Sequence, residues 1–237
     1  VEIMKGAGCD DVVVLPFDDE FSKMTPDEFV QKVLLEACHA RGVVIGPDFH
    51  FGHKRSGNIV NLREWSEREG FSVEVVDPVM FEGEAVSSTR IRRVLAEDGD
   101  VEDVARMLTR LHEVTGEVVP GDQRGRTIGF PTANLNTGEL QLPKDGVYSV
   151  FARVLGEPGE LIPGVANLGN RPTFEAGRSV EVHLLDFEGD IYGTEMRIGF
   201  ASRIRGEQKF DGLDGLKAQI AKDCDSAKNA LQRTSLE

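Results

Sequence analysis

From residue 112 onward the sequence consists mainly of short alternating segments separated by Gly, Pro and Asp turns. Alternation of apolar and polar residues with a period of two is typical of half-buried strands. Six such segments with few helices between them predict a small closed antiparallel barrel. The predicted strands are Glu113–Val119, Thr132–Leu135, Gly146–Leu155, Leu161–Asn167, Val180–Phe187 and Met196–Ala201.

A helix is predicted after the last strand. Apolar residues recur at Leu213, Leu216, Ile220 and Ala221, which is the spacing of one helical face. We therefore expect a C-terminal helix over Leu213–Leu231 that packs on the barrel.

The first half of the chain has a different pattern, in which helical and strand-like segments alternate. Such alternation predicts a parallel sheet with crossover helices. Thr25-Pro-Asp-Glu supplies an N-cap, a proline at the first helical position and early acids, so it predicts a helix over 25–39. The other predicted helices are Asn58–Glu69, Ser87–Glu97 and Val101–Leu108; the predicted strands are Val12–Leu15, Val43–Ile45 and Phe71–Val76, with a hairpin over Val79–Val86.

The two patterns predict two domains, residues 1–111 and 112–237, with the boundary near Leu111. Val1–Gly6 is typical of the last turns of a helix, and the chain does not begin with Met. We therefore expect the N-terminal domain to be incomplete.

Composition excludes several classes of protein. The net charge is −14, from 27 basic and 41 acidic residues, whereas a nucleic-acid-binding surface is usually basic. Cys9, Cys38 and Cys224 lie far apart without a C-x-x-C pair, which favours a reducing compartment and argues against a zinc site. No apolar run approaches the length of a membrane span, so we expect a cytoplasmic protein without membrane or nucleic-acid partners.

A glycine-rich stretch, Gly121–Asn134, follows the first predicted strand of the barrel. Glycine lets successive backbone N–H groups converge on an anion, because it tolerates positive φ and leaves room for a phosphate. Thr132 and Asn134 are two residues apart, so in an extended segment their side chains point to the same side. This combination suits a metal-bound polyphosphate; the alternative is a hairpin loop with solvated arginines. The candidate ligand-binding residues are Gly121, Arg124, Gly125, Arg126, Gly129, Thr132 and Asn134.

A second candidate phosphate site begins at the predicted helix Ser87–Glu97. Ser87, Ser88 and Thr89 would stand at its N-terminus with Arg92 one turn later. Free N–H groups and the helix dipole favour anions there. An ordinary N-cap explains the same residues equally well.

Glu181 is the candidate acid–base residue. In the predicted strand, Val180, Val182 and Leu184 share one face, while Glu181 and His183 share the other. A carboxylate beside a histidine on one barrel face suits proton transfer, although a solvated strand glutamate is the alternative. Asp186 is a competing carboxylate whose place at a strand end favours a turn, and we expect His183 to be structural.

These residues resemble those of a known family. Gly-x-x-x-Gly-Arg-x-x-Gly-Phe-Pro-Thr-Ala-Asn over 121–134 is similar to the riboflavin kinase signature. The region before residue 111 resembles the other half of the bacterial bifunctional riboflavin kinase/FMN adenylyltransferases. Four further segments follow in the family's order: Lys144–Tyr148, Gly164–Phe174, Val180–Phe187 and Glu207–Phe210.

The resemblance implies a partial Rossmann-like nucleotidyltransferase domain (α/β), followed by a six-stranded antiparallel riboflavin-kinase β-barrel with a C-terminal helix. It implies transfer of the ATP γ-phosphate to the riboflavin 5′-hydroxyl, giving FMN, with Mg²⁺ as cofactor. It also implies that Glu181 is the catalytic base, that Thr132 and Asn134 serve Mg²⁺, and that Arg205 and Phe210 contact the flavin. A non-catalytic flavin-binding module is the alternative function.

The second activity of the family is adenylylation of FMN to FAD. For this activity, the resemblance implies that the ATP phosphates are bound by Ser87, Ser88, Thr89 and Arg92. The family's catalytic His-x-Gly-His belongs to a first strand–loop–helix unit that has no match in this sequence. His50-Phe-Gly-His53 fits that pattern literally, but its flanks resemble a later loop of the family. We therefore expect His50 and His53 to be loop residues and the second activity to be absent or weak.

Overall fold

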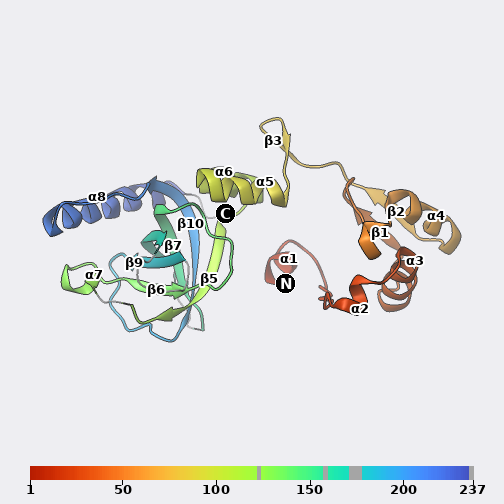
Figure 1. Ribbon diagram of the computed structural model, residues 1–237, viewed down its shortest axis with the longest axis horizontal. Coiled ribbons are helices and arrows are strands. Elements are labelled where there is room, and N and C mark those ends of the chain that lie inside the picture. The colour runs from red at the N-terminus through yellow and green to blue at the C-terminus, as the bar shows by residue number, and fades with distance from the viewer. Residues whose placement is uncertain (122–123, 157–159, 171–177, 235–237) are drawn as a thin grey trace. The chain divides into compact units, whose positions relative to one another are not determined.

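The computed structural model describes residues 1–121, 124–156, 160–170 and 178–234. They form two compact units, Val1–Ala85 and Val86–Glu237 (Figure 1). Residues 86–111 therefore pack with the barrel rather than with the first half of the chain. The functional division near Leu111 remains a prediction.

The first unit contains a parallel two-stranded sheet, as predicted. β1 (Gly42–Ile45) pairs with β2 (Ser72–Val75), with Gly42 opposite Ser72. Its hydrophobic core consists of Val30, Ile45, Phe51, Leu62 and Phe71. The remaining elements are α1 (Glu2–Gly6), α2 (Asp19–Ser22), α3 (Pro26–Glu28), η1 (Phe29–Ala37), η2 (His53–Arg55), α4 (Ile59–Glu69), β3 (Met80–Phe81) and β4 (Glu84–Ala85).

Local capping explains where the helices of this unit begin and end. Thr25 Oγ1 accepts from the backbone N–H of Glu28 at 3.2 Å, while the Glu28 carboxylate accepts from the N–H of Thr25 at 3.0 Å. This reciprocal pair starts α3, which continues as η1, so the predicted helix over 25–39 is confirmed apart from its end. Asn58 caps α4, and Gly70 ends it in the left-handed conformation.

The predicted strand Val12–Leu15 is wrong. The segment belongs to no strand, and Val13, Val14 and Leu15 are exposed, Val14 by 72%. A strand needs a partner for its backbone hydrogen bonds. Among the described residues, β1 and β2 pair with each other and neither pairs with this segment.

The second unit contains the predicted closed barrel, with strand order β10-β5-β6-β9-β8-β7 and antiparallel neighbours throughout. Its core includes Val150, Ala166, Val182, Ile198 and Phe200, all completely buried. The strands are β5 (His112–Val119), β6 (Ala133–Asn136), β7 (Gly146–Val154), β8 (Ile162–Asn170), β9 (Arg178–Leu184) and β10 (Glu195–Arg205).

One predicted turn of the barrel is in part a strand. The polar sequence Asn167–Phe174, with Gly169 and Pro172, predicts a turn between strands, yet β8 continues to Asn170, which pairs with Arg178. The segment lacks the apolar alternation of a strand, but its backbone from Asn167 to Asn170 pairs with β9. The rest of that segment, 171–174, lies outside the described residues.

Three helical segments precede the barrel: α5 (Ser88–Arg93), η3 (Val94–Asp98) and α6 (Val101–Leu108), at the predicted positions. Barrel side chains satisfy the free carbonyl groups at the end of η3. Lys144 Nζ donates to the carbonyl oxygen of Glu97 at 2.6 Å, and Arg203 Nη1 donates to that of Asp98 at 3.2 Å. The three helices are thus fixed to the barrel by hydrogen bonds as well as by packing.

Gly99 permits this docking. It has a φ of +71°, and a Cβ there would lie 2.7 Å from the hydroxyl oxygen of Tyr148. That hydroxyl donates to the carbonyl oxygen of Lys144 at 2.6 Å. A side chain at Gly99 would therefore push the helices away from the barrel.

The last helix, α8 (Leu213–Leu231), lies along the barrel and contacts β7, β8 and β10 (Figure 1), as predicted. Its buried residues include Cys224, Ala227 and Leu231. In the described part of the chain, no helix is long and apolar enough to cross a membrane.

Candidate functional site

Three polar residues stand in one row across neighbouring strands of the barrel. Glu181 of β9 lies opposite Asn134 of β6 on one side and opposite Asn167 of β8 on the other. Directly opposed residues point to the same face of a sheet, with Cβ atoms about 5 Å apart. Asn134 is only 6% exposed, whereas Asn167 is open to solvent. The row thus leads from the protein interior to its surface.

The row opens into a cavity of about 660 Å³ between the barrel, α7 (Arg124–Thr127) and α8, which we call the α8 cavity. Glu181 and Asn167 line it together with Thr132. Its apolar wall comes from three separate segments and includes Ile128, Phe130, Phe210, Leu216 and Ile220. This size and mixture suit a small organic ligand.

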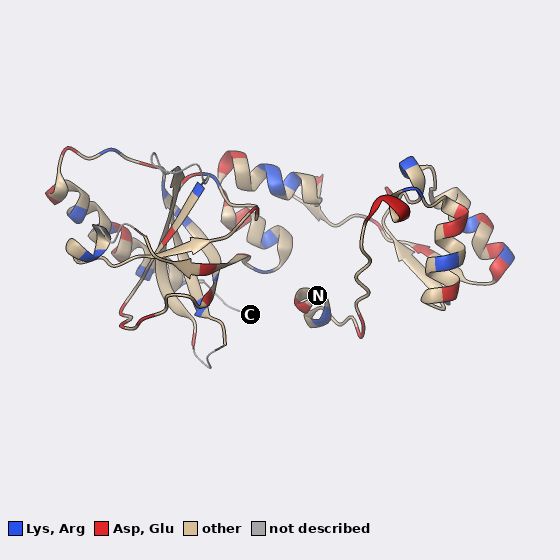
Figure 2. Cartoon of the chain, turned by 60° about the horizontal axis from the view of Figure 1, so that its bottom comes forward, with Lys and Arg blue, Asp and Glu red and all other residues tan. Residues whose placement is uncertain are grey.

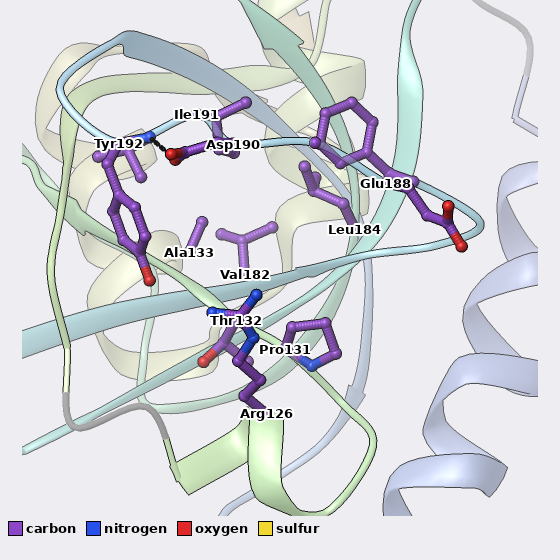
Figure 3. A pocket seen from close by; sticks show the side chains of 13 residues that line it. Arg126, Pro131, Thr132, Ala133, Val182, Leu184, Glu188, Asp190, Ile191 and Tyr192 are labelled. Atoms are coloured by element: carbon purple, nitrogen blue, oxygen red, sulfur yellow. Dashed lines mark hydrogen bonds between the residues drawn. The ribbon is translucent and has the colours of Figure 1, made fainter.

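A second cavity, of about 450 Å³, lies beyond the N-terminal end of β6; we call it the Tyr192 cavity (Figure 3). Val182, Leu184, Ile191 and Tyr192 form its apolar lining, and Arg126 stands at its border. Figure 3 shows the Arg126 side chain extending toward Thr132, with the Tyr192 ring pointing to the same end of the cavity. Asp190 shapes the turn, because its carboxylate accepts from the backbone N–H of Tyr192 at 3.1 Å.

Thr132 lines both cavities. It directly precedes β6, so the start of this strand separates the two spaces. A ligand in one cavity and a ligand in the other would therefore approach each other at Thr132. This is the geometry that a transfer between two substrates needs.

The glycines of the loop are required by close approach. A Cβ at Gly121 would overlap the side-chain amide of Asn134, and a Cβ at Gly125 would overlap the carbonyl oxygen of Phe130. Gly129 has a φ of +90°, which other residues rarely adopt. Arg124 begins α7, but its side chain lies outside the described part of the structure.

His183 holds the turn that leads into β6. Its Nδ1 atom is 2.7 Å from the carbonyl oxygen of Pro131, and its ring packs edge-on against Phe130 at 5.5 Å. Both contacts are to structural groups of the loop. The geometry supports the expected structural role of His183.

Arg205 and Phe210, expected to contact a flavin, both line the α8 cavity. The guanidinium of Arg205 is paired with the carboxylate of Asp223 in α8, with Nη2 and Oδ2 2.7 Å apart. It also lies 5.8 Å from the centre of the Phe210 ring. The ion pair with Asp223 thus holds the Arg205 guanidinium in one position at the edge of the cavity.

Asp186, the competing carboxylate, is placed differently from Glu181. It follows the end of β9 with a φ of +56° and accepts from Lys228 Nζ at 2.9 Å. This hydrogen bond raises the pKa of Lys228. Asp186 lines neither of the two cavities. The geometry therefore favours Glu181 for chemistry.

The other predicted residues lie elsewhere. Ser87 caps α5 by accepting from the backbone N–H of Arg90 at 3.2 Å, while Ser88, Thr89 and Arg92 are exposed on that short helix. His50 is an exposed loop residue of the first unit, as expected, and His53 is exposed at the start of the short helix η2. None of these residues lines the α8 or Tyr192 cavity.

Sequence reasoning missed the Tyr192 cavity. Phe187–Tyr192 has the Gly and Asp residues of an ordinary turn. The sequence does carry one signal for this cavity, because the polar turn contains two aromatic residues, Phe187 and Tyr192. Exposed turns seldom contain large apolar side chains.

No group of three or more His, Cys, Asp or Glu side chains is placed to hold a metal within the described residues. The hydroxyl of Thr132 and the amide oxygen of Asn134 are hard oxygen donors. Mg²⁺ commonly takes only one or two ligands from protein and the remainder from phosphates and water. The site therefore fits a magnesium ion that arrives with a polyphosphate.

Two family models match the chain: riboflavin kinase over residues 108–231 and FAD synthetase over residues 1–90. The bifunctional riboflavin kinase/FMN adenylyltransferase of Haemophilus influenzae is 40% identical over 226 residues, covering 95% of this chain and 72% of the relative. The protein of the same name from Escherichia coli K12 is 39% identical over 91% of this chain and 68% of its own length.

A solved structure also matches over most of the chain. A crystal structure of a Streptococcus pneumoniae protein, named there a macrolide-efflux protein, superimposes with a TM-score of 0.83 and 32% identity. The match covers 96% of this chain and 73% of the other. The architecture of this chain is therefore shared with a protein that has been solved experimentally.

Proposed function

We propose, because the chain belongs to the bifunctional riboflavin kinase/FMN adenylyltransferase family, that its barrel transfers the γ-phosphate of ATP to the 5′-hydroxyl of riboflavin. The products are FMN and ADP. The single observation that carries the residue assignment is the position of Thr132 between two cavities.

The α8 cavity suits the flavin. Its aromatic and aliphatic wall, with Ile128, Phe130 and Phe210, matches a large apolar ring system. The polar row on the opposite side, Asn167 and Glu181, suits the hydroxyl groups of a sugar-like chain. Arg205, fixed by Asp223, completes the polar edge without needing to reorganise when the ligand binds.

The Tyr192 cavity suits the nucleotide. Tyr192 and Phe187 offer faces on which a purine can stack, and Arg126 stands where the cavity meets the glycine loop. The remaining phosphate contacts fall to Arg124 and to the backbone of Gly121, Gly125 and Gly129. Thr132 and Asn134 would hold Mg²⁺, which neutralises charge on the phosphate chain.

Glu181 orients the riboflavin hydroxyl and accepts its proton. It lines the α8 cavity, and its cross-strand neighbour Asn134 follows Thr132 by two residues in the chain. Phosphoryl transfer asks mainly for positioning and charge stabilisation from the protein. A carboxylate on a barrel strand supplies a rigid position for the attacking oxygen.

For the second activity of the family, we retain Ser87, Ser88, Thr89 and Arg92 as the candidate ATP-phosphate contacts. The support is limited to the N-terminal geometry of α5 and the order of the residues. A cytoplasmic location belongs to the same proposal, since exposed thiols such as Cys9 and Cys38 suit a reducing compartment.

The test is chromatography of flavins after incubation of the protein with riboflavin, ATP and Mg²⁺. FMN formation supports the kinase. Glu181→Gln should lower kcat about 10²- to 10⁴-fold, while Glu195→Gln, an exposed strand carboxylate, should leave it unchanged. Bound riboflavin without FMN would replace the kinase with a flavin-binding module, and full turnover by Glu181→Gln would remove the base assignment.

A further inference from the structure

A third cavity, of about 730 Å³, lies where β5, β7 and β10 meet α6 and the end of α8; we call it the arginine cavity. Among the described residues, it shares no lining residue with the α8 or Tyr192 cavity. Two of its described lining residues are carboxylates, Glu102 and Glu113. Five are arginines: Arg106, Arg110, Arg153, Arg197 and Arg233.

This concentration of positive charge runs against the composition of the chain, whose net charge is −14. Figure 2 shows acidic and basic residues interspersed along the helices of both units. Among the described lining residues, arginines outnumber carboxylates by three, although the chain as a whole is acidic.

Two of the arginines are held side by side by the barrel itself. Arg153 of β7 lies directly opposite Arg197 of β10 in the strand register. Like charges in directly opposed positions destabilise a sheet. Arg197 is oriented by Thr115, its partner on β5, because its Nε donates to the Thr115 hydroxyl oxygen at 3.4 Å. An anion bound between the two guanidinium groups would reduce the repulsion between them.

The charges of the cavity are only partly compensated. Arg106 Nη1 pairs with Asp103 Oδ1 at 2.9 Å, at an exposed position. Arg110 Nη1 donates to the carbonyl oxygen of Leu111 at 3.0 Å. Arg153 and Arg233 take part in no ion pair with the residues that the structure describes. These two guanidinium groups are available to a ligand.

The geometry points to a second nucleotide site: we propose that the arginine cavity binds the phosphate chain of a nucleoside di- or triphosphate. Guanidinium groups match phosphate oxygens in two-point hydrogen bonds. Phe151, Leu161 and Leu111 give the same cavity an apolar wall on which a base can pack. Its volume falls in the range of small-ligand sites.

An extended polyanion fits this site poorly. Nucleic acids are bound along basic faces or stripes, whereas these arginines surround a single hollow on an acidic protein. The proposal does not depend on the kinase assignment, because none of the residues involved belongs to the kinase site.

Calorimetric titration with ADP tests the proposal, using the full chain and two separate variants. The wild type should bind two equivalents. Arg153→Ala/Arg233→Ala should keep one site unchanged and weaken the other at least tenfold, whereas Arg126→Ala should weaken only the site retained by that double variant. Arg41→Ala/Arg63→Ala, which removes the same charge from exposed positions of the first unit, should still bind two.

Inorganic pyrophosphate separates a nucleotide site from a general anion site. We expect it to bind the arginine cavity of Arg126→Ala about tenfold more weakly than ADP does, because it lacks the base. Equal affinities would overturn the nucleotide assignment. A single wild-type ADP equivalent that Arg126→Ala weakens, or unchanged binding in Arg153→Ala/Arg233→Ala, would overturn the site itself. FMN formation by that double variant should match the wild type, which verifies its fold.

Discussion

Arg205 and Asp223 form a two-point ion pair between the end of β10 and the middle of α8. Arg205 Nε is 3.0 Å from both carboxylate oxygens, and Nη2 is 2.7 Å from Oδ2. Gln219 donates to the same carboxylate at 2.9 Å. Asp223 is almost fully buried, so this pair fixes the helix that forms one wall of the α8 cavity.

Removal of Asp223 should destabilise the barrel unit. Asp223→Ala leaves the Arg205 guanidinium largely buried without its anion, which typically costs about 3–5 kcal/mol. Chemical denaturation followed by circular dichroism measures this loss. Asp225→Ala, an exposed carboxylate two residues along the same helix, should change the free energy of unfolding by less than about 0.5 kcal/mol. Equal effects of the two substitutions would show that the pair does not fix α8.

A methyl group at Gly121 should impair catalysis. The Cβ of Gly121→Ala would overlap the Asn134 side chain and displace it from its proposed place beside the metal and phosphate groups. Displacement of a positioning group by about 1 Å can reduce the rate about 100-fold, so we expect a comparable fall in kcat/KM for ATP. Initial rates of FMN formation give this value.

The matched control is Gly215→Ala in α8, where a Cβ would meet nothing within 4 Å. Alanine is the better helix former, so this variant should be as active as the wild type and slightly more stable. A Gly121→Ala protein with normal kinetics would contradict the close packing of the loop on Asn134.

His112 should make the barrel less stable in mild acid. Its Nε2 lies 2.8 Å from the carbonyl oxygen of Gln141, its ring stacks on Phe200, and burial lowers its pKa from 6.5. As pH falls below about 6.5, the unfolded chain takes up a proton that the folded chain resists. The stability contributed by neutral His112 is therefore present above that pH and is lost as pH falls toward the lower pKa of the folded state.

Urea denaturation of the wild type and His112→Gln at pH 7.5 and pH 5.5 measures this effect. The difference in unfolding free energy between the two pH values should be smaller in His112→Gln. His50→Gln changes an exposed loop histidine and should leave the wild-type pH dependence in place. An unchanged dependence in His112→Gln would assign it to other groups.

Cys224 should resist alkylation in the folded protein. Burial against the barrel raises the pKa of its thiol to about 11, and the thiolate is the reactive form. Cys9 and Cys38 are exposed, so iodoacetamide at pH 7.5 should modify both. Mass spectrometry of the intact and digested protein should show two labels when folded and three in urea. Rapid labelling of Cys224 would indicate that α8 leaves the barrel readily.

The strands of the barrel could be predicted because each carries its own two-residue periodicity. The helix starts at Thr25 and Asn58 could be predicted for the same reason, because a cap depends on only three or four neighbouring residues. Val12–Leu15 has strand-forming residues but no hydrogen-bonding partner in the described chain, and pairing is not encoded within four residues. β8 extended further than predicted for the opposite reason, because pairing with β9 overrode its polar sequence.

The candidate site was predictable as a list of residues but not as an arrangement. Thr132 and Glu181 stand 49 positions apart in the chain, and only the pairing of β6 with β9 puts them on one cavity. The Tyr192 and arginine cavities depend on side chains from several distant segments. A pattern within one short segment cannot predict which distant segments line a cavity together.

The docking of α5, η3 and α6 bears on how this barrel can be exchanged between proteins. A chain divided at residue 112 would expose Val101, Val104 and Met107, and it would leave Lys144 and Arg203 without the carbonyl groups they cap. An inherited or engineered fusion that keeps the barrel intact must therefore carry residues 86–111 with it. The smallest piece that can be transplanted is longer than the barrel, and Gly99 marks where the additional helices are attached.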